Sequence, residues 1–160
     1  IEDDFIDRDL TIVDYVNEII KSFKETSKKE FIINFDQYSN SFNITKSIEI
    51  VYGLRNFIGN ANKFSKSKVF INIKSDADIT EILIEDDGEG YPNDVLRKIG
   101  EPYIKSYKSS IKSKSGLGLG IFIGKTLLEK NYASILCRNS ETRGGAEVNI
   151  KWKNKNLLKL

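Results

Sequence analysis

Residues 79–90 read ITEILIEDDGEG, a β-rich run that leads directly into four acidic residues and two glycines. A second β-rich run lies at 69–73, and the polar residues 75–78 between the two predict a hairpin turn. Glycine lets the backbone turn tightly and approach a planar ligand, and the carboxylate of Asp86 can accept a hydrogen bond from an exocyclic amine. The same residues are also compatible with an ordinary acidic turn.

Four acidic residues within five positions also suggest a calcium-binding loop. An EF-hand, however, spreads its oxygen ligands over about 12 residues between two helices. Here a predicted strand leads into the acidic residues, which disfavours the calcium interpretation.

The composition limits the classes of function open to the chain. Its 160 residues are 39% apolar and 30% charged, which predicts one compact domain. The net charge of +2 provides no general attraction to nucleic acid or anionic membrane. Without histidine, the chain cannot hold an ordinary catalytic triad, an imidazole metal ligand or a phosphohistidine. The single cysteine, Cys137, excludes an internal disulfide and is expected to be a buried, unreactive thiol.

Three polar residues, Asn56, Asn60 and Lys63, share one narrow face of a helix predicted at 47–64. The amides can supply a neutral oxygen ligand to a hard cation, and the ammonium can pair with a phosphate. A solvated helix face explains these residues too. Asparagine is a poor helix former, however, so two of them in an otherwise apolar helix need a reason.

The run SGLGLG at 115–120 is the third candidate motif, and it leads into a predicted helix. Glycine at alternate positions exposes backbone N–H groups beside a helix N-terminus, which favours phosphate binding. The run lacks the GK[ST] of a Walker A loop, and it follows a basic segment, whereas a dinucleotide fingerprint follows a first strand. Each motif is weak alone, but the three in this order strongly indicate a nucleotide site.

The remaining periodicities predict a two-layer α/β sandwich. The expected order is a helix (11–24), a strand (31–35), a helix (47–64), the hairpin, a short helix, a lid, a helix after the glycine run and two strands (133–139 and 146–152). A polar loop fills 36–45. This order predicts a mixed sheet of about five strands with about three helices on one face.

Apolar positions at helical or strand spacing predict which side chains face the core. They are Ile48, Val51, Leu54, Ile58 and Ala61 in the second helix, Leu119, Phe122, Ile123, Thr126 and Leu127 in the last helix, and Val148, Ile150 and Trp152 in the last strand. The alternate residues of that strand, Glu147, Asn149 and Lys151, are expected to face water.

Three segments lie outside the predicted core. The acidic residues 1–9 are expected to be a junction from a missing upstream domain, 10–153 the folded domain, and 154–160 a C-terminal tail. The serine- and lysine-rich segment at about 101–115 is expected to be a mobile lid that triphosphate charge orders. The chain has no Met and no apolar run of the about 20 residues that span a bilayer, so it is expected to be a piece of a longer protein.

In order, GNANKF (59–64), EDDGEG (85–90) and SGLGLG (115–120) resemble the N box and the two glycine boxes of the gyrase, Hsp90, histidine kinase and MutL superfamily. The resemblance covers about residues 10–152 and implies the Bergerat-type ATP-binding fold with a mobile ATP lid. Within this superfamily the chain looks like the catalytic domain of a bacterial sensor histidine kinase. The runs GEPY (100–103), LGLGIFIGKTLLE (117–129) and GAEVNIKW (145–152) are similar to redox-responding kinases of the RegB/PrrB group.

The resemblance implies a role for each matching position of the first motif. Asn60 would be the Mg²⁺ ligand, and Asn56 would help it from one helical turn earlier. Lys63 would contact phosphate, and Phe64 would pack on the base. The resemblance therefore makes Asn56, Asn60 and Lys63 the catalytic residues.

The other two boxes would hold the nucleotide. Asp86 would accept a hydrogen bond from the adenine amino group, in a pocket shaped by Gly88 and Gly90. Lys105 stands where many such kinases carry an arginine, which leaves its role at the γ-phosphate open. The resemblance also assigns to ATP binding Tyr91, Gly116, Leu117, Gly118, Leu119 and Gly120, with the glycines as the phosphate seat.

One position distinguishes members of the superfamily by activity. Members that hydrolyse ATP usually carry a glutamate one turn before the Mg²⁺-binding asparagine, as a general base that activates water. Here that position is Asn56, whose amide cannot take the proton. The resemblance therefore implies transfer of the γ-phosphoryl group of Mg-ATP to a histidine outside this chain, with little hydrolysis.

The expected partners follow from the same resemblance. In the family the phosphoacceptor histidine lies on a helical dimerisation domain just upstream, so the parent protein is expected to be a homodimer that signals to a response regulator. The chain would then be a cytoplasmic domain that contacts neither nucleic acid nor membrane. The sequence leaves open the stimulus, the regulator, and whether the parent protein is an inner-membrane sensor.

Three alternatives remain open. A degenerate domain could hold ATP, or nothing, and signal by contact, although all three boxes are intact. An ATP hydrolase of the gyrase or MutL type is the second alternative, against which Asn56 argues. Tyr103 and Tyr107 among the lid lysines resemble a surface for single-stranded nucleic acid, which a net charge of only +2 disfavours.

Overall fold

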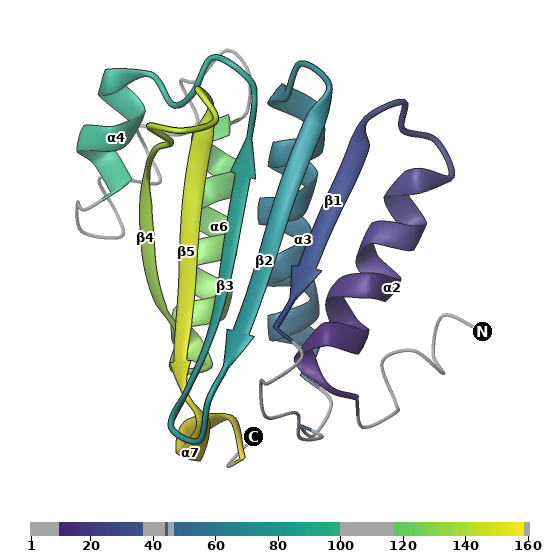
Figure 1. Ribbon diagram of the computed structural model, residues 1–160. Helices are drawn as coiled ribbons and strands as arrows, with labels where there is room; N and C mark the ends of the chain where they lie inside the picture. Colours follow the sequence, from purple (N-terminus) through teal and green to yellow (C-terminus); the bar gives the residue numbers. More distant parts are fainter. Residues whose placement is uncertain (1–9, 37–43, 45–46, 100–116, 159–160) are drawn as a thin grey trace.

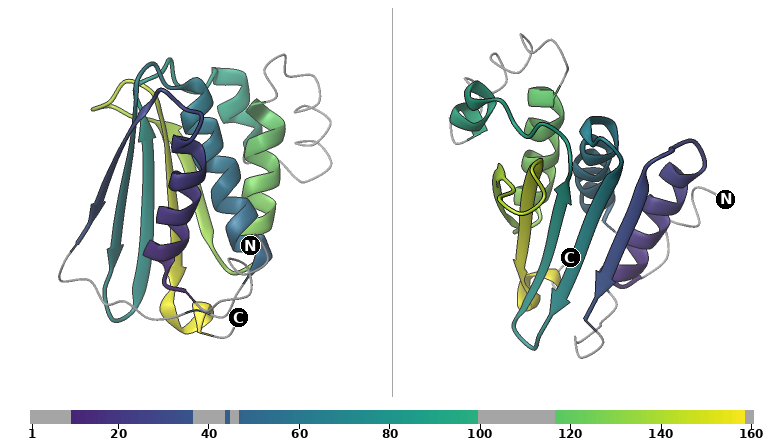
Figure 2. Two further views of the ribbon diagram at one scale, coloured as in Figure 1. Left: turned by 90° about the vertical axis from the view of Figure 1, so that its right-hand side faces the viewer. Right: turned by 45° about the horizontal axis from the view of Figure 1, so that its top comes forward.

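The computed structural model describes residues 10–36, 44, 47–99 and 117–158. These residues form two layers, a five-stranded sheet and a row of helices against one of its faces (Figure 1). The helices α2 (Ile12–Lys24), α3 (Ile48–Phe64) and α6 (Leu117–Lys130) all lie on the same side of the sheet, as the turned view in Figure 2 shows. The predicted two-layer α/β sandwich is confirmed.

The sheet is mixed. In spatial order its strands are β1 (Glu30–Phe35), β2 (Lys68–Ser75), β3 (Ile79–Asp86), β5 (Ala146–Lys153) and β4 (Ser134–Asn139). β1 and β2 run parallel, and the other neighbours run antiparallel. The predicted hairpin is confirmed as β2 and β3, and β3 is the central strand. The acidic run of the sequence therefore begins at the end of the central strand.

Helices α2 and α3 begin where the local sequence predicts. Thr11 caps α2 in a capping box, because its hydroxyl accepts from the N–H of Asp14 while the Asp14 carboxylate accepts from the N–H of Thr11. Ser47 caps α3 by accepting from the N–H of Ile50. Each cap satisfies N–H groups that have no partner inside the helix.

Two short elements complete the described residues. The helix α4 (Asn93–Ile99) follows the acidic turn, as expected for the short helix in the sequence order. The four residues of α7 (Asn154–Leu157) lie within the expected tail, yet Leu157 is fully buried. The packed part of the chain therefore extends beyond the expected boundary at 153. Ile44, in the segment expected to be a loop, is also buried and forms an isolated bridge with Leu10.

The buried face of α6 differs from the predicted stripe. Ile121, Gly124 and Leu128 face the core, whereas Ile123 is 38% exposed. The reason is the close approach of α6 to α3: a Cβ at Gly124 would lie 2.8 Å from the ring of Phe57. Glycine has no apolar side chain, so the sequence pattern did not include Gly124, although this residue lies on the face of α6 that contacts α3.

Other expected burial patterns fail at single positions. In α3, Ile48 is 51% exposed, and it is the first residue of the helix. In β5, Glu147 was expected to face water but is only 6% exposed. It forms an ion pair with Arg138 of the neighbouring strand, and this pair offsets the free-energy cost of burying the Glu147 charge.

Cys137 lies in the edge strand β4 and is half-buried, where a buried position was expected. Burial nevertheless raises the pKa of its thiol to about 12, against a smaller lowering by its hydrogen bond with Tyr91. A thiol with this pKa is protonated at neutral pH, and the thiolate is the reactive form. The expected low reactivity of Cys137 is supported.

Candidate nucleotide-binding site

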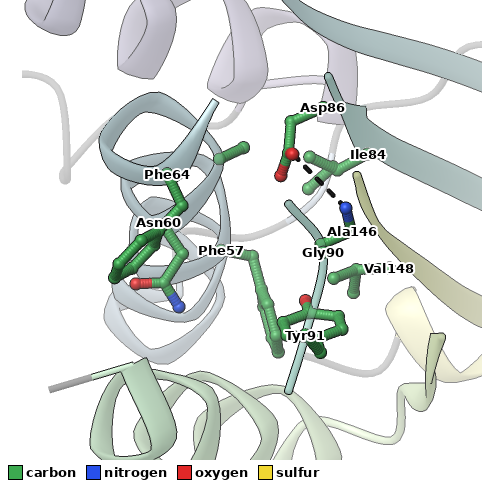
Figure 3. A pocket seen from close by; sticks show the side chains of 10 residues that line it. Phe57, Asn60, Phe64, Ile84, Asp86, Gly90, Tyr91, Ala146 and Val148 are labelled. Atoms are coloured by element: carbon green, nitrogen blue, oxygen red, sulfur yellow. Dashed lines mark hydrogen bonds between the residues drawn. The ribbon is translucent and has the colours of Figure 1, made fainter. Parts of the chain in front are cut away.

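A pocket opens between the C-terminal half of α3 and the ends of β3 and β5 (Figure 3). Its walls are mostly apolar, and its polar side chains come from two motifs far apart in sequence. The lining residues are Phe57, Asn60, Ala61, Phe64, Ile84, Asp86, Gly90, Tyr91, Ala146 and Val148. A concave, mainly apolar pocket with a few converging polar groups is the usual form of a small-molecule site.

Among the described residues, Asp86 is the only acidic one that lines this pocket, and it is 4% exposed. Its Oδ1 accepts from the N–H of Gly88 at 2.8 Å and from the N–H of Ala146 at 3.3 Å. Burial raises the pKa of Asp86, and these two hydrogen bonds lower it by less. Because both bonds end on Oδ1, Oδ2 is the oxygen that can accept from a ligand in the pocket.

Two glycines make room for this carboxylate. A Cβ at Gly145 would overlap both Oδ1 and the carbonyl oxygen of Asp86. A Cβ at Gly88 would overlap the carbonyl oxygen of Phe64 at the end of α3. The acidic turn after β3, the β4–β5 turn and the end of α3 therefore touch one another around Asp86, and only glycine fits at these contacts.

Gly90 has a different role in the same turn. Its φ of +82° lies in the left-handed region, which glycine adopts at little cost. Next to it, Tyr91 exchanges two backbone hydrogen bonds with the amide of Asn139, its N–H donating to Oδ1 at 2.6 Å. Tyr91 is 5% exposed, and its ring forms part of the pocket wall. The backbone turns at Gly90, and Asn139 holds Tyr91 in that wall.

Asn60 lines the pocket from α3, on the opposite side from Asp86 (Figure 3). Among the described residues, two buried side-chain nitrogens have no hydrogen-bond partner, Nδ2 of Asn60 and Nε1 of Trp152. Buried polar groups nearly always have a partner in a native protein. Trp152 lies in the core, whereas Asn60 lines a pocket, so the unsatisfied nitrogen of its amide is a candidate group for binding a ligand in that pocket.

The other residues of the first motif are placed differently. Asn56 is half-buried, and its amide donates to the carbonyl oxygen of Tyr52. It is not one of the residues that line the pocket. Lys63 is exposed, with its ammonium 5.2 Å from the centre of the Phe64 ring. Phe64 itself lines the pocket. The structure thus brings Asn60 and Phe64 to Asp86, while Asn56 and Lys63 lie at the margin.

The glycine run is described only in part. Lys105 and Gly116, with the expected lid at 101–115, lie outside the described residues. Gly118, Leu119 and Gly120 lie inside α6, which begins at Leu117, so they form its first turn and not a loop before it. A Cβ at Gly120 would lie 3.0 Å from Oδ1 of Asn60. The start of α6 is therefore beside the amide that lacks a partner.

Sequence reasoning missed half of the pocket lining. Phe57, Ala61, Ile84, Ala146 and Val148 appear in the sequence only as members of apolar periodicities, and nothing local separates them from core residues. Gly145 enters the sequence analysis only as the first residue of GAEVNIKW, although the GG pair at 144–145 could have marked a close contact. These residues reach the pocket through strand pairing and helix packing.

The three consecutive carboxylates at 85–87 have three different surroundings. Glu85 points to the opposite face of the sheet from Asp86 and accepts from the hydroxyl of Ser140 at 2.6 Å. Asp87 accepts hydrogen bonds from the loop after α3. Among the described residues, no group of three or more His, Cys, Asp or Glu side chains is arranged to hold a metal ion. The acidic run therefore offers one carboxylate to the pocket.

Among the described residues, no helix has both the length and the apolar character to cross a bilayer.

Comparison with known proteins agrees with this geometry. Residues 45–156 match the family described as "Histidine kinase-, DNA gyrase B-, and HSP90-like ATPase". The sensor histidine kinase RegB of Cereibacter sphaeroides is 37% identical over 125 residues, which cover 68% of this chain. The chain spans only 27% of the length of that relative. The sensor histidine kinase WalK of Bacillus subtilis is 26% identical, over 84% of this chain and 23% of its own length.

Solved structures share the fold. The catalytic domain of histidine kinase ThkA has a TM-score of 0.71 at 18% identity and matches over 91% of this chain and 94% of its own. Full-length ShkA, solved in complex with AMPPNP, has a TM-score of 0.66 at 19% identity, over 91% of this chain and 30% of its own. Because the family match spans most of the chain and the fold agrees with it, the chain belongs to the family of histidine kinase-, DNA gyrase B- and HSP90-like ATPases.

Proposed function

We propose that this chain binds Mg-ATP and is the catalytic domain of a sensor histidine kinase, which transfers the γ-phosphoryl group to a histidine outside the chain. The observation that carries the proposal is the pair of incompletely bonded groups across one apolar pocket, Oδ2 of Asp86 and Nδ2 of Asn60. A ligand with a flat ring, an amino group and a polyanionic end complements such a pocket.

Each wall of the pocket has a role in holding the nucleotide. The carboxylate of Asp86 accepts from the amino group of adenine through Oδ2. The apolar side chains of Ile84, Val148 and Tyr91 surround the ring and exclude water from that hydrogen bond. Burial raises the pKa of Asp86, and the two N–H groups that donate to Oδ1 oppose this shift by stabilising the ionised form.

Asn60 holds the metal end of the nucleotide. Its amide offers a neutral oxygen to Mg²⁺ and an N–H to a phosphate oxygen, which would satisfy the nitrogen that has no partner. Lys63, Lys105, Gly116, Gly118 and Gly120 would complete the phosphate site, with Leu117 and Leu119 beside it. Mg-ATP supplies the phosphoryl group, and the metal ion neutralises the charge that develops on it.

The acceptor of the phosphoryl group comes from elsewhere, because this chain has no histidine. Asn56 cannot serve as a general base for water, and its amide already donates to the carbonyl oxygen of Tyr52. These two facts favour transfer over hydrolysis. The partners would be the dimerisation domain that carries the histidine and a response regulator, in a homodimeric parent protein whose kinase domain is cytoplasmic.

The likeness to RegB, 37% identity over 125 residues, supports this function. RegB is named a sensor histidine kinase, and the ShkA structure holds AMPPNP. The redox-responding character of the group that RegB represents would have to depend on other parts of the parent protein, because the only cysteine here has a pKa of about 12.

Calorimetric titration with AMPPNP, with and without Mg²⁺, tests the proposal on the wild-type chain, Asp86→Asn and Asn60→Asp. Asp86→Asn replaces the accepting oxygen by a donor, and we expect AMPPNP affinity to fall by about 100-fold, since a buried unpaired group costs about 1–3 kcal/mol. Asn60→Asp should change the Mg²⁺ dependence of binding. Asp76→Asn, at the opposite end of β3, is the matched control and should bind as the wild type does.

A folded wild-type chain that does not bind AMPPNP would overturn the proposal and favour a module that signals by contact alone. If the wild type binds, its reaction distinguishes the remaining possibilities. Steady release of phosphate by the isolated chain would indicate an ATP hydrolase. Labelling of a histidine-containing dimerisation domain from [γ-³²P]ATP, without steady release, is the result expected for a kinase.

A further inference from the structure

We propose that Asp87 is a positioning residue for the nucleotide pocket, which holds the end of α3 at a set distance from Asp86. This inference rests on the proposed function, because it concerns the affinity of the same pocket. Asp87 does not line the pocket, and its side chain points away from it into the loop after α3. Its effect on a nucleotide would therefore be exerted through other residues.

The Asp87 carboxylate is bonded to three consecutive residues, two at the end of the α3–β2 loop and the first residue of β2. Oδ1 accepts from the N–H groups of Lys66, Ser67 and Lys68 at 2.8, 3.0 and 3.1 Å. Oδ2 accepts from the Ser67 hydroxyl at 2.9 Å. These bonds outweigh the effect of burial and lower the pKa of Asp87 from 3.8 to about 2, so the carboxylate is ionised at neutral pH. One ionised side chain thus holds the end of this loop and the start of β2.

That loop begins at the last turn of α3, which forms one wall of the pocket. Phe64, the last residue of α3, lines the pocket, and its carbonyl oxygen lies against Gly88, where no Cβ would fit. The opposite wall is Asp86, the residue immediately before Asp87. Because Asp87 joins the loop to the acidic turn, it connects the wall of Asn60 and Phe64 to the wall of Asp86.

The end of α3 has a second support, from the segment after α2. The Lys29 ammonium donates to the carbonyl oxygen and the hydroxyl of Ser65, and the Ser27 hydroxyl donates to Asn62 at 2.5 Å. These contacts hold α3 to the segment after α2. They can keep the helix folded when Asp87 is changed, but they do not set its distance from Asp86. The fold and the geometry of the pocket are therefore separable at this position.

The chain provides a matched control for the same chemistry. Asp76 is an exposed aspartate in the β2–β3 turn, and its Oδ1 accepts from the N–H groups of Asp78 and Ile79, each at 2.8 Å. Hydrogen bonds from these two residues lower the pKa of Asp76, as the loop does for Asp87. The turn lies at the far end of the hairpin from the pocket (Figure 1). Asp76 and Asp87 therefore differ mainly in what their loops support.

The test is Mg-AMPPNP titration and thermal unfolding of the wild type, Asp87→Ala, Asp87→Asn and Asp76→Ala. We expect Asp87→Ala to raise the Kd for Mg-AMPPNP by about tenfold or more, because the three N–H groups lose their acceptor. Asp87→Asn keeps an oxygen at Oδ1 and should stay within about threefold of the wild type. Asp76→Ala should lower the Tm by a similar amount to Asp87→Ala without changing the Kd.

The outcomes separate this inference from the proposed function. A wild type that does not bind overturns the proposed function and this inference with it. A wild type that binds, with a folded Asp87→Ala that binds equally well, overturns only this inference. Equal losses of affinity in Asp87→Ala and Asp76→Ala would also contradict it, because they would show a general effect of destabilisation.

If Asp87→Ala does not fold, Asp87→Glu replaces it in the comparison. Glutamate keeps the charge but moves the carboxylate by one methylene, so it cannot meet the three N–H groups at the same positions. The inference then requires a higher Kd for Asp87→Glu than for Asp87→Asn. The opposite order would show that the charge, and not the position of the acceptor, supports the pocket.

Discussion

Strand β3 has polar residues at both of its ends, but those at the turn end bond to one another and those at the pocket end do not. At the turn end, the Thr80 hydroxyl donates to Oδ1 of Asn154 at 2.7 Å and lies 2.8 Å from the Ser75 hydroxyl. Nδ2 of Asn154 donates to the carbonyl oxygen of Asp76 at 2.7 Å. Ser75, Thr80 and Asn154 are buried, and their hydrogen bonds form a closed network, in which each of these side chains has a partner within the fold.

At the pocket end, the side chains face an open space. Asp86 uses only one of its two oxygens, and the amide nitrogen of Asn60 has no partner among the described residues. Both ends are formed by the same antiparallel pairing. The difference teaches that a buried polar group that bonds within the fold stabilises it, whereas one left open toward a pocket is reserved for a ligand.

The largest effect that this comparison predicts is at Gly145. In Gly145→Ala the new Cβ overlaps backbone and carboxylate atoms of Asp86, so we expect a loss of about 3 kcal/mol in the free energy of unfolding and at least a 100-fold loss of AMPPNP affinity. Urea denaturation and calorimetry measure the two effects.

The neighbouring residue is the control for this prediction. Gly144 has a φ of +86°, and a Cβ there would meet nothing within 4 Å. Gly144→Ala should therefore cost about 1 kcal/mol, from backbone strain alone, and should not alter binding. If the two variants bind AMPPNP equally well, the contact between Gly145 and Asp86 does not shape the pocket.

Substitutions of Asn154 and Asn60 test the same comparison, with smaller expected effects. Asn154→Ala removes two bonds of the closed network and leaves buried partners unsatisfied, which should cost about 2 kcal/mol of stability without changing AMPPNP affinity. Asn60→Ala removes an amide with no partner for its nitrogen and introduces a better helix former, so stability should change by less than about 0.5 kcal/mol. Its Mg-AMPPNP affinity should nevertheless fall.

Denaturation curves and titrations of both asparagine variants decide this prediction. A large loss of stability in Asn60→Ala would mean that its amide serves the fold. A loss of affinity in Asn154→Ala would mean that the two ends of β3 are coupled.

The smallest predicted effect is a change in the free energy of unfolding at pH 7 that has opposite signs in two Asp→Asn variants. Burial raises the pKa of Asp86, so the folded chain holds this proton more tightly than the unfolded chain, and wild-type stability falls as the pH rises from 3.8 to the raised pKa. Asp86→Asn lacks this titration and should be more stable than the wild type at pH 7.

Asp76 should behave in the opposite way. Hydrogen bonds from Ile79 and Asp78 lower its pKa, so its contribution to stability is present above pH 3.8 and is lost as the pH falls through the lowered value. Asp76→Asn should be less stable than the wild type at pH 7, with the gap closing in acid. Denaturation at several pH values measures the stability of both variants. If Asp86→Asn and Asp76→Asn change the free energy of unfolding in the same direction at pH 7, the predicted difference between the two residues is wrong.

The sequence predicts most of the secondary structure because the relevant forces act between near neighbours. Thr11 and Asp14 are three residues apart, and their capping box marks the start of α2. The alternation of Val148, Ile150 and Trp152 predicts the buried face of β5. Where prediction fails, a distant partner decides: Gly124 is on the buried face of α6 because Phe57 of α3 lies against it.

The candidate site was only half predictable for a similar reason. Asn60, Phe64, Asp86 and Gly90 could be named from motifs, since the spacing of polar residues and glycines within a motif is local. Ile84, Ala146 and Val148 could not, because each reads as an ordinary strand residue. They enter the pocket because β5 pairs with β3 and brings Val148 opposite Ile84.

By itself, the sequence determined the two-layer fold, the three motifs and the absence of an acceptor histidine, because composition and short-range spacing carry that information. Only the tertiary structure decided which of three consecutive carboxylates serves the pocket. Successive residues of a strand point to opposite faces, so Asp86 meets the helices while Glu85 meets the β4–β5 turn. Asp87, beyond the strand end, meets the loop after α3, because strand pairing brings that loop beside it.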